Sequence, residues 1–446
     1  MRDSDDAVRR PRGLAARLAR LRSSGARRTG LTITAISAGL CLFAAACSGS
    51  ASPASNAQPG GGKAAAPPSP ASRLAITPAN GASGVRTDAS IRVSASHASL
   101  SKVTVSTGGT PVSGQLNHAR TSWRPNWPLH TDTRYTVTAT GTGPNGKAVK
   151  RTSSFRTVNP SASYSVSIFE GAGQTYGVGM PIMLTFSQPV TRKYAVEKAM
   201  SLKTSKPVAG AWYWDGDQTL VFRPQNYWPQ HTRVSFKGHF DGLRIAPHVY
   251  GTANLTQDFR IGASLITVAS TRTHYMKVFY KGKEIGNWPI STGQPGKDTA
   301  NGTYLTIEKG NPTRMKGNGY NVLVPFAVRF TWSGNYIHDA YWSVAQQGHV
   351  NVSHGCVNVS PAHSHTYYDL ANPGDPVTVV GSPAAGKWDD GWTEWFLTWH
   401  QLLRGSATHL AVKAGPDGSE FVNPSTLPGA RTTRLHGSKP FNYNSK

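Results

Sequence analysis

Cysteine is scarce in this chain, with only three in 446 residues: Cys41, Cys47 and Cys356. The first two lie in an N-terminal segment that has the composition of an export signal. If that segment is cleaved before Cys47 and Cys47 is acylated, Cys356 is the only free thiol of the mature chain. An intramolecular disulfide is then excluded, and a lone Cys with His nearby in sequence is a candidate nucleophile.

Acidic residues are also few, with 22 Asp and Glu against 47 Lys and Arg and a formal net charge of +25. A strongly basic exported protein favours an anionic surface as its partner, either wall polymers or phospholipid headgroups. Nucleic acid is the generic alternative for a basic protein. The scattered basic residues and the lack of a nucleic-acid-binding motif argue against it.

No apolar run has the length of a typical membrane span. Leu31–Ala46 has sixteen residues, whereas a spanning helix needs about 20. Because Arg-rich residues precede this run and three Ala end it, residues 1–46 are predicted to be a signal peptide. Cys47 follows directly and is predicted to be lipidated. Leu42 lies five residues before Cys47 rather than the usual three, so a plain signal peptide is the alternative. Residues 47–72, rich in Ser, Ala, Gly and Pro, are predicted to form a flexible linker.

Helix-type runs are few, whereas 46 Gly and 30 Pro favour β structure with many turns. The segment Trp123-Arg124-Pro125 has a counterpart 99 residues later in Phe222-Arg223-Pro224, and both are followed by Trp-Pro and His-Thr. This spacing predicts two copies of a β-sandwich, in residues 73–158 and 159–262. The repeated Trp and Pro are predicted to be core and turn residues.

The chemistry-bearing motif lies downstream of both sandwiches. His338 is followed, after fourteen intervening residues, by Ser353-His354-Gly355-Cys356-Val357-Asn358. A thiol, an imidazole that can take its proton, and a glycine beside the nucleophile are the parts of thiolate acyl transfer. A zinc site built from His338, His354 and Cys356 is the alternative by ligand type. Since a second paired ligand motif is missing, we predict no metal and no cofactor.

This motif and its spacing resemble the signature of the L,D-transpeptidase (YkuD-type) catalytic domain, over roughly residues 263–382. Within this range, Ser291-Thr292-Gly293 and residues 299–304 resemble the family's substrate-side loops, with Ala300 where the family usually has Pro. Residues 318–320 resemble part of the active-site lid of actinobacterial members. The two sandwiches resemble the immunoglobulin-like domains that precede the catalytic domain in those members.

The resemblance implies a mainly β protein with four parts. Two immunoglobulin-like β-sandwiches are followed by a YkuD-type β-rich catalytic domain and by a short helical Trp-rich C-terminal subdomain in residues 383–446. In that subdomain Trp388, Trp392, Trp395 and Trp399 would fall on one stripe of a helix. We predict that the stripe docks on a neighbouring domain rather than on a membrane or a glycan. Residues 405–446 are polar and are expected to wrap a domain surface or to be partly disordered.

The resemblance also implies roles for the reacting residues. Cys356 is the nucleophile and His338 is the base, because an imidazole titrates near neutrality. The backbone carbonyl of Asp339 is the third member, which orients the His. The Asp339 carboxylate either adds charge stabilisation or faces solvent. His349 is expected to be a structural or surface residue.

The remaining predicted site residues surround the thiol. The N–H groups of Gly355 and Cys356 are candidates for an oxyanion hole, and Tyr320 is a candidate phenol donor from the lid. His354 is expected to structure the loop or contact substrate, and Ser353 and Asn358 to hold the turn.

The implied function is that of an exported enzyme, lipid-anchored to the cell membrane and facing the cell wall. Its partners would be peptidoglycan stem peptides, with no nucleic acid. The thiol would cleave a tetrapeptide stem after its third residue and transfer the acyl group to a second stem, giving a 3→3 cross-link. One alternative is the same fold used as a hydrolase or to attach proteins or other amines to the wall. Another is a non-catalytic wall-binding lipoprotein, which would have no use for an activated thiol.

Overall fold

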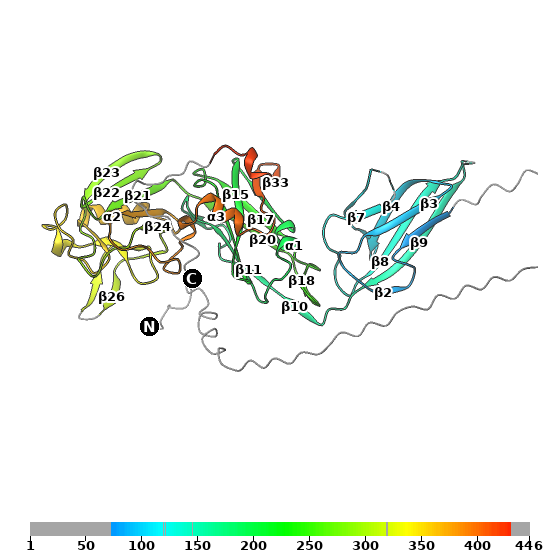
Figure 1. Ribbon diagram of the computed structural model, residues 1–446, viewed down its shortest axis with the longest axis horizontal. Helices are drawn as coiled ribbons and strands as arrows, with labels where there is room; N and C mark the ends of the chain where they lie inside the picture. Colours follow the sequence, from blue (N-terminus) through cyan, green and yellow to red (C-terminus); the bar gives the residue numbers. More distant parts are fainter. Residues whose placement is uncertain (1–72, 119, 121, 145, 318–319, 430–446) are drawn as a thin grey trace, which may run out of the picture. The chain divides into compact units, whose positions relative to one another are not determined.

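The computed structural model describes residues 73–429 except 119, 121, 145, 318 and 319. The predicted signal peptide, the lipidation site Cys47 and the linker lie outside the described residues. The described part is mainly β with few helices, as predicted (Figure 1). None of its helices has the length and apolar character needed to cross a membrane.

Two sheets form the first sandwich. The first sheet consists, in spatial order, of β1 (Arg73–Thr77), β3 (Ile91–Ser96), β7 (Ser122–Pro125) and β6 (Gly114–Leu116). The second consists of β2 (Ala82–Val85), β9 (Ala148–Thr157), β8 (Arg134–Thr142), β4 (Ser99–Thr107) and β5 (Thr110–Pro111). Alternate residues of β8 are buried, and they pack with Ile91 and Trp123 to form the core.

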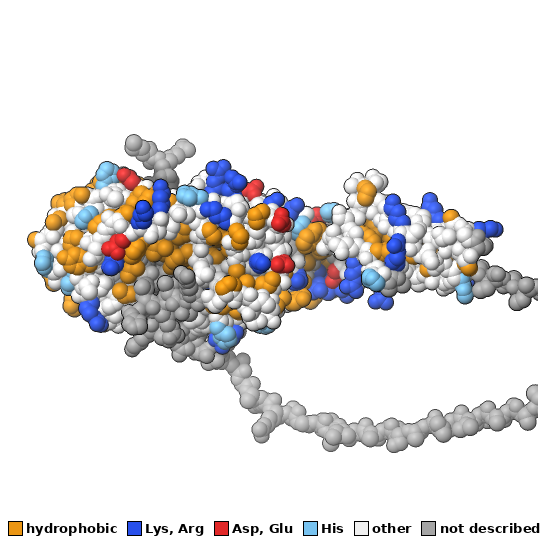
Figure 2. Space-filling model, turned by 90° about the horizontal axis from the view of Figure 1, so that it is seen from above, with side chains coloured by type: hydrophobic (Ala, Val, Ile, Leu, Met, Phe, Trp, Pro, Cys, Tyr) orange, Lys and Arg blue, Asp and Glu red, His pale blue; other side chains and the backbone are white. Residues whose placement is uncertain are grey.

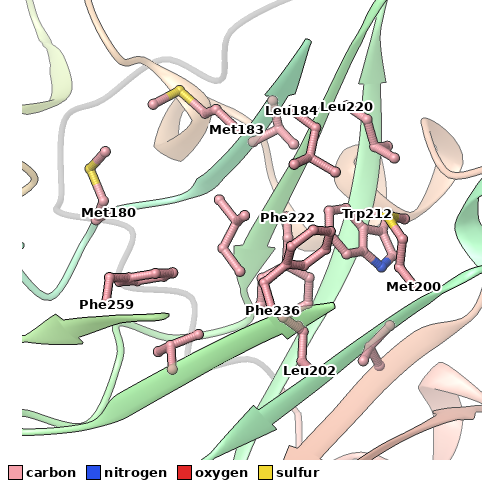
Figure 3. Packing of buried hydrophobic residues seen from close by; sticks show 14 of the residues in the cluster. Met180, Met183, Leu184, Met200, Leu202, Trp212, Leu220, Phe222, Phe236 and Phe259 are labelled. Atoms are coloured by element: carbon pink, nitrogen blue, oxygen red, sulfur yellow. The ribbon is translucent and has the colours of Figure 1, made fainter. Parts of the chain in front are cut away.

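The second sandwich has two main sheets and one small sheet. The first main sheet consists of β11 (Val166–Ile168), β13 (Ile182–Phe186), β16 (Thr219–Pro224), β15 (Val208–Asp215), β32 (Ala411–Gly415) and β33 (Gly418–Val422). The second consists of β12 (Thr175–Tyr176), β20 (Leu255–Ile261), β17 (Arg233–Gly238) and β14 (Met200–Thr204). The small sheet consists of β10 (Ala162–Tyr164), β19 (Val249–Gly251) and β18 (Arg244–Ala246). Its neighbouring helix is α1 (Lys193–Lys198). Leu184, Trp212, Phe222 and Phe236 meet between the main sheets (Figure 3).

The repeated Trp residues have different surroundings. Trp123 and Trp228 are buried, at 4% and 2% exposure, as predicted for core residues. The Nε1 of Trp228 donates to the Met180 carbonyl at 2.6 Å. Trp127, in contrast, is 39% exposed, so the core prediction is wrong for it. It lies in the loop after β7, beyond the last position that the sheet orients toward the core.

The prediction of one helical Trp stripe is wrong. The segment contains only the 3₁₀ helix η2 (Glu394–Phe396) and the short helix α3 (Trp399–Arg404). Gly391 has a φ of +130° and breaks the first part. The Thr398 side chain caps α3 by accepting from the Gln401 N–H, which begins a separate helix.

The predicted docking of the Trp residues is confirmed. Trp392 is 1% exposed and belongs to the core of the second sandwich. Trp388 packs edge-on against Tyr213 of β15, and Trp395 Nε1 donates to the Gly179 carbonyl at 2.8 Å. The tail then returns as the hairpin β32–β33, which extends the sheet at β15, and ends in η3 (Pro424–Thr426). Residues 430–446 lie outside the described residues.

A buried carboxylate fixes the tail to the second sandwich. Glu197 of α1 is fully buried, and its oxygens accept hydrogen bonds from Trp214 Nε1, Ser406 Oγ and Thr408 Oγ1 at 2.7–2.8 Å. The Ala407 N–H donates to the same carboxylate at 2.7 Å. Because a buried charge is stable only when such donors surround it, residues 406–408 are held in one position.

The third region carries the site and has two sheets, a hairpin and one longer helix. Its larger sheet consists of β23 (Lys283–Pro289), β22 (Tyr275–Tyr280), β21 (Leu265–Ser270), β31 (Pro376–Val380) and β24 (Gly302–Leu305). Its smaller sheet consists of β25 (Glu308–Gly310), β28 (Ala327–Arg329), β29 (Tyr336–Asp339) and β30 (Val357–Val359). The other elements are the hairpin of β26 (Thr313–Gly317) and β27 (Tyr320–Val324), the 3₁₀ turn η1 (Tyr341–Ser343) and α2 (Pro361–Leu370).

Candidate active site

Two neighbouring strands position the predicted base, and the predicted nucleophile directly precedes one of them. β29 and β30 are parallel, with Ile337 opposite Val357 and His338 opposite Asn358. Ile337 and Val357 are buried in the core, so the alternating side chains of His338 and Asn358 lie on the other face. Cys356 lies in the bend immediately before β30 and packs against a cluster that includes Ala327 of β28. The backbone N–H of Tyr336, two residues before His338 in β29, contacts the Cys356 sulfur, so the thiol lies beside the strand that carries the base.

The His338 ring has one fixed tautomer. Its Nδ1 lies 2.7 Å from the Asp339 carbonyl oxygen, which can only accept, so Nδ1 carries a proton. In the neutral ring, Nε2 therefore holds the lone pair. The ring is 3% exposed, and burial lowers the pKa of His338 to about 4 despite the opposing effect of the Asp339 carbonyl. At neutral pH the imidazole is thus uncharged and able to accept a proton at Nε2.

The carboxylate of Asp339 does not face solvent. The residue is 6% exposed, and Oδ1 accepts the Tyr341 N–H at 3.0 Å. Burial raises the pKa of this carboxyl, and the Tyr341 N–H partly opposes the shift. The side chain therefore stabilises the turn into η1, while the backbone carbonyl contacts His338.

The Cys356 thiol is uncharged at rest. Burial raises the pKa of Cys356 to about 11, although the backbone N–H of Tyr336 favours the thiolate. The sulfur lies 3.8 Å from the Gly334 carbonyl, to which the S–H donates. Since burial disfavours charge on both Cys356 and His338, the resting state is a thiol and a neutral imidazole. A thiolate–imidazolium pair would have to form during attack.

The loop before Cys356 is held by its own side chains and turns at a glycine with positive φ. Ser353 Oγ donates to the Cys356 carbonyl at 2.7 Å and accepts the Gly355 N–H at 3.1 Å. Gly355 has a φ of +119°, and a Cβ there would lie 2.8 Å from Asn335 Oδ1. Because the Gly355 N–H is engaged by Ser353, the oxyanion donor that remains of the predicted pair is the Cys356 N–H.

The substrate-side loops are bound directly to this catalytic loop. Thr299 Oγ1 donates to the Gly355 carbonyl at 2.8 Å and accepts the Gly293 N–H at 2.9 Å. Asn351 Oδ1 accepts from both the N–H and the hydroxyl of Thr292. The sequence placed Thr299 in a substrate-side loop but gave no sign of its hydrogen bonds to the catalytic loop, and Asn351 belongs to no recognisable motif.

Asn358 connects β30 to the turn after the base. Its Nδ2 donates to Ser343 Oγ at 3.0 Å, and Ser343 Oγ in turn donates to the Ala340 carbonyl at 3.3 Å. Next to this turn, the Trp342 ring lies against the His338 ring with centroids 5.9 Å apart, and Trp342 is 51% exposed. The aromatic neighbour of the base was also missed, since a lone Trp in a loop gives no sequence signal.

The β26–β27 hairpin covers the thiol. Met315 and Val324 of the hairpin form a small cluster against which Cys356 packs. Tyr320 lies with its ring centroid 5.4 Å from that of His354. Burial raises the pKa of Tyr320, and the nearby Cys356 adds to the shift. The structure thus brings the predicted lid residue, the thiol and His354 together. His349 is exposed, with its N–H bound to the Gln346 carbonyl.

The described residues contain no group of three or more His, Cys, Asp or Glu side chains placed to hold a metal ion. The described site itself supplies a thiol, an imidazole and hydrogen-bond donors.

Comparison with known proteins assigns the family. The L,D-transpeptidase catalytic domain family matches residues 264–379, and the bacterial Ig domain family matches residues 82–244, a range that includes parts of both sandwiches. L,D-transpeptidase 2 of Mycobacterium tuberculosis (strain CDC 1551 / Oshkosh) is 33% identical over 350 residues, which are 75% of this chain and 85% of that protein. The chain belongs to the L,D-transpeptidase family.

A second relative agrees with this assignment, and a solved structure is also similar. L,D-transpeptidase 5 of M. tuberculosis (strain ATCC 25618 / H37Rv) is 32% identical, over 76% of this chain and 78% of that protein. A solved structure of an L,D-transpeptidase in complex with imipenem is 35% identical and covers 50% of this chain and 100% of its own, with a TM-score of 0.42. As an L,D-transpeptidase, this chain is an acyltransferase, so the alternative of a non-catalytic wall-binding protein is set aside.

Proposed function

We propose that this L,D-transpeptidase forms 3→3 cross-links between peptidoglycan stem peptides through an acyl-enzyme on Cys356. The observation that supports this most is the position of the Cys356 thiol beside β29, the strand that carries His338, whose Nδ1 is held by the Asp339 carbonyl. Because Nδ1 carries the proton, Nε2 is the nitrogen that can accept the thiol proton during attack.

In the first half-reaction, the sulfur of Cys356 bonds to the carbonyl carbon of the third stem residue. Its proton passes to His338 Nε2 as the bond forms, because neither group is charged beforehand. The Asp339 carbonyl stabilises the imidazolium through Nδ1–H. The Cys356 N–H and the Tyr320 phenol are the donors for the oxyanion. When the C–N bond breaks, Nε2–H protonates the amine of the departing D-Ala.

In the second half-reaction, the side-chain amine of a diamino acid on another stem attacks the thioester. His338 Nε2 takes the proton of this amine and returns it to the sulfur as the C–S bond breaks. The amide product then links two third residues, and the thiol is regenerated. A neutral imidazole suits both steps, since it accepts a proton each time before giving one away.

The test is product analysis with the purified full chain and a disaccharide-tetrapeptide. We expect a cross-linked dimer whose mass equals two substrates minus one alanine, with fragmentation that places the new amide between the two third residues. Accumulation of tripeptide monomer alone would support the hydrolase alternative and contradict the proposal. The same incubation with other amines would reveal an attachment activity. A carbapenem, as a mimic of the acyl donor, should compete with the stem.

We infer that the chain is exported, cleaved before Cys47 and anchored to the membrane by lipid on Cys47. The sixteen-residue apolar run and the three preceding Ala support this. The two or three acyl chains of a bacterial lipoprotein hold a protein firmly, whereas one chain does so only marginally. Cell fractionation should find wild type in membranes and Cys47→Ala shed or uncleaved. A freely soluble wild type with a mature N-terminus far from Cys47 would rule the anchor out.

A further inference from the structure

The outer face of one sheet in the first sandwich carries a groove of about 390 Å³. Strand β3 shows why this face is polar. Ile91 and Val93 are fully buried, so Arg92 and Ser94 between and after them point outward. The lining from the strands is Ala75 and Thr77 of β1, Arg92 and Ser94 of β3, and Ser122 and Arg124 of β7.

Two arginine side chains project from neighbouring strands of this face. Arg92 is opposite Ser122 in the sheet register, and Arg124 lies two residues further along the strand of Ser122. The usual strand spacing and rise then place the Cα atoms of Arg92 and Arg124 roughly 8 Å apart. Thr77 is opposite Arg92 on the other side, so hydroxyl groups flank the arginines.

No acidic side chain of this sandwich remains to neutralise them. Residues 73–158 contain eleven Lys and Arg but only two acidic residues, Asp88 and Asp132. Asp88 is paired with Arg86 and Asp132 with Arg156, each at 2.8 Å. Within the described part of the chain, Arg92 and Arg124 have neither a hydrogen bond nor an ion pair to another side chain. Figure 2 shows several Lys and Arg side chains on the visible face of the first sandwich.

We propose that this groove binds a linear anionic polymer with phosphodiester-linked polyol repeats. A guanidinium presents a planar fork of donors that fits a phosphate, and two forks at this spacing suit successive phosphates of one chain. The hydroxyls of Thr77, Ser94 and Ser122 then meet the polyol. Such binding lies outside acyl transfer, and it would hold the enzyme against the wall through the first sandwich.

The lining argues against two other anionic partners. Ala75 is the single apolar residue among the six named, so nothing in the groove would insert into a lipid bilayer. The groove also lacks an aromatic ring on which nucleobases could stack. Phosphate charge combined with hydroxyl groups is the chemistry that the lining matches.

The experiment compares two doubly substituted full chains that lose the same charge. Arg92→Gln/Arg124→Gln removes both groove arginines. Arg134→Gln/Lys150→Gln removes two exposed cations from the other sheet, at β8 and β9. Affinity for poly(glycerol phosphate) is measured at several salt concentrations, and thermal melting checks that each variant is folded. We expect the groove variant to bind at least about tenfold more weakly with a shallower salt dependence, and the control less than about threefold more weakly.

Equal losses of affinity in the two variants would show that only overall charge matters. That result would overturn the assignment of the groove as the binding site. Wild-type binding to phosphatidylglycerol vesicles or to polyglutamate, with none to poly(glycerol phosphate), would overturn the assigned polymer. Wild type that binds none of these would do so as well. The groove variant should keep its full rate on a soluble disaccharide-tetrapeptide, so a failure of this proposal is separable from a failure of the proposed cross-linking function.

Discussion

Cys356→Ala is expected to lose all detectable transpeptidation, a fall of at least about 10³-fold, because no other group in the site can form the acyl-enzyme. The intact mass of wild type after incubation with a carbapenem should show one covalent adduct per chain. The variant should show none. Cys356 is the only cysteine in the described part of the chain, so a second thiol there cannot substitute for it.

Cys356→Ser provides the sharper comparison. It keeps a nucleophilic atom, but a hydroxyl gives up its proton far less readily than a thiol, and a neutral imidazole with a depressed pKa is a weak base. We expect this variant to be inactive too. Since both substitutions remove little volume, melting temperatures close to that of wild type should show that the fold is intact. Cross-linking by either variant, or equal carbapenem labelling, would refute the assigned nucleophile.

His338→Ala should slow acylation by about 10²- to 10⁴-fold while stem binding changes little, because the imidazole acts on the proton in transit. His349→Ala is the matched control, since His349 is an exposed His eleven positions later in the same region. It should cost less than about threefold. Single-turnover kinetics measures the effect of each His variant on acylation. Equilibrium binding of the stem, with each His variant combined with the inactivating Cys356→Ala, measures its effect on binding. If His349→Ala is the more damaging, the assigned base is wrong.

The pH dependence of acylation distinguishes a buried base from an ordinary one. Nε2 accepts a proton only when the ring is neutral, and burial lowers the pKa of His338 to about 4. Raising the pH through 4 frees the base, so the rate should rise there and stay level near neutrality. A further increase is expected only toward pH 11, where the thiol itself ionises. A midpoint near 6.5, the ordinary value for His, would show that substrate or the lid leaves the ring solvated.

The sequence was informative wherever a signal was local. The repeated Trp-Arg-Pro and Phe-Arg-Pro segments located two sandwiches, and the spacing from His338 to Cys356 located a possible reacting pair. The helical Trp stripe failed because periodicity said nothing of Gly391, whose backbone breaks it. Two features of the site could not be predicted from a residue pattern, because they depend on tertiary packing and burial. These are the hydrogen bond from the Gly355 N–H to Ser353 and the uncharged state of the Cys356 thiol.

The hairpin β32–β33 makes the second sandwich a discontinuous domain. Its sheet begins with β11, before the catalytic region, and is completed by strands that follow it in sequence. The catalytic region is therefore an insertion attached to one sandwich at both of its ends, which restricts its rotation more than a single linker would. The edge of β15 stays unpaired until the last part of the chain arrives, so folding of this sandwich can be completed only after the enzyme's catalytic part has been made.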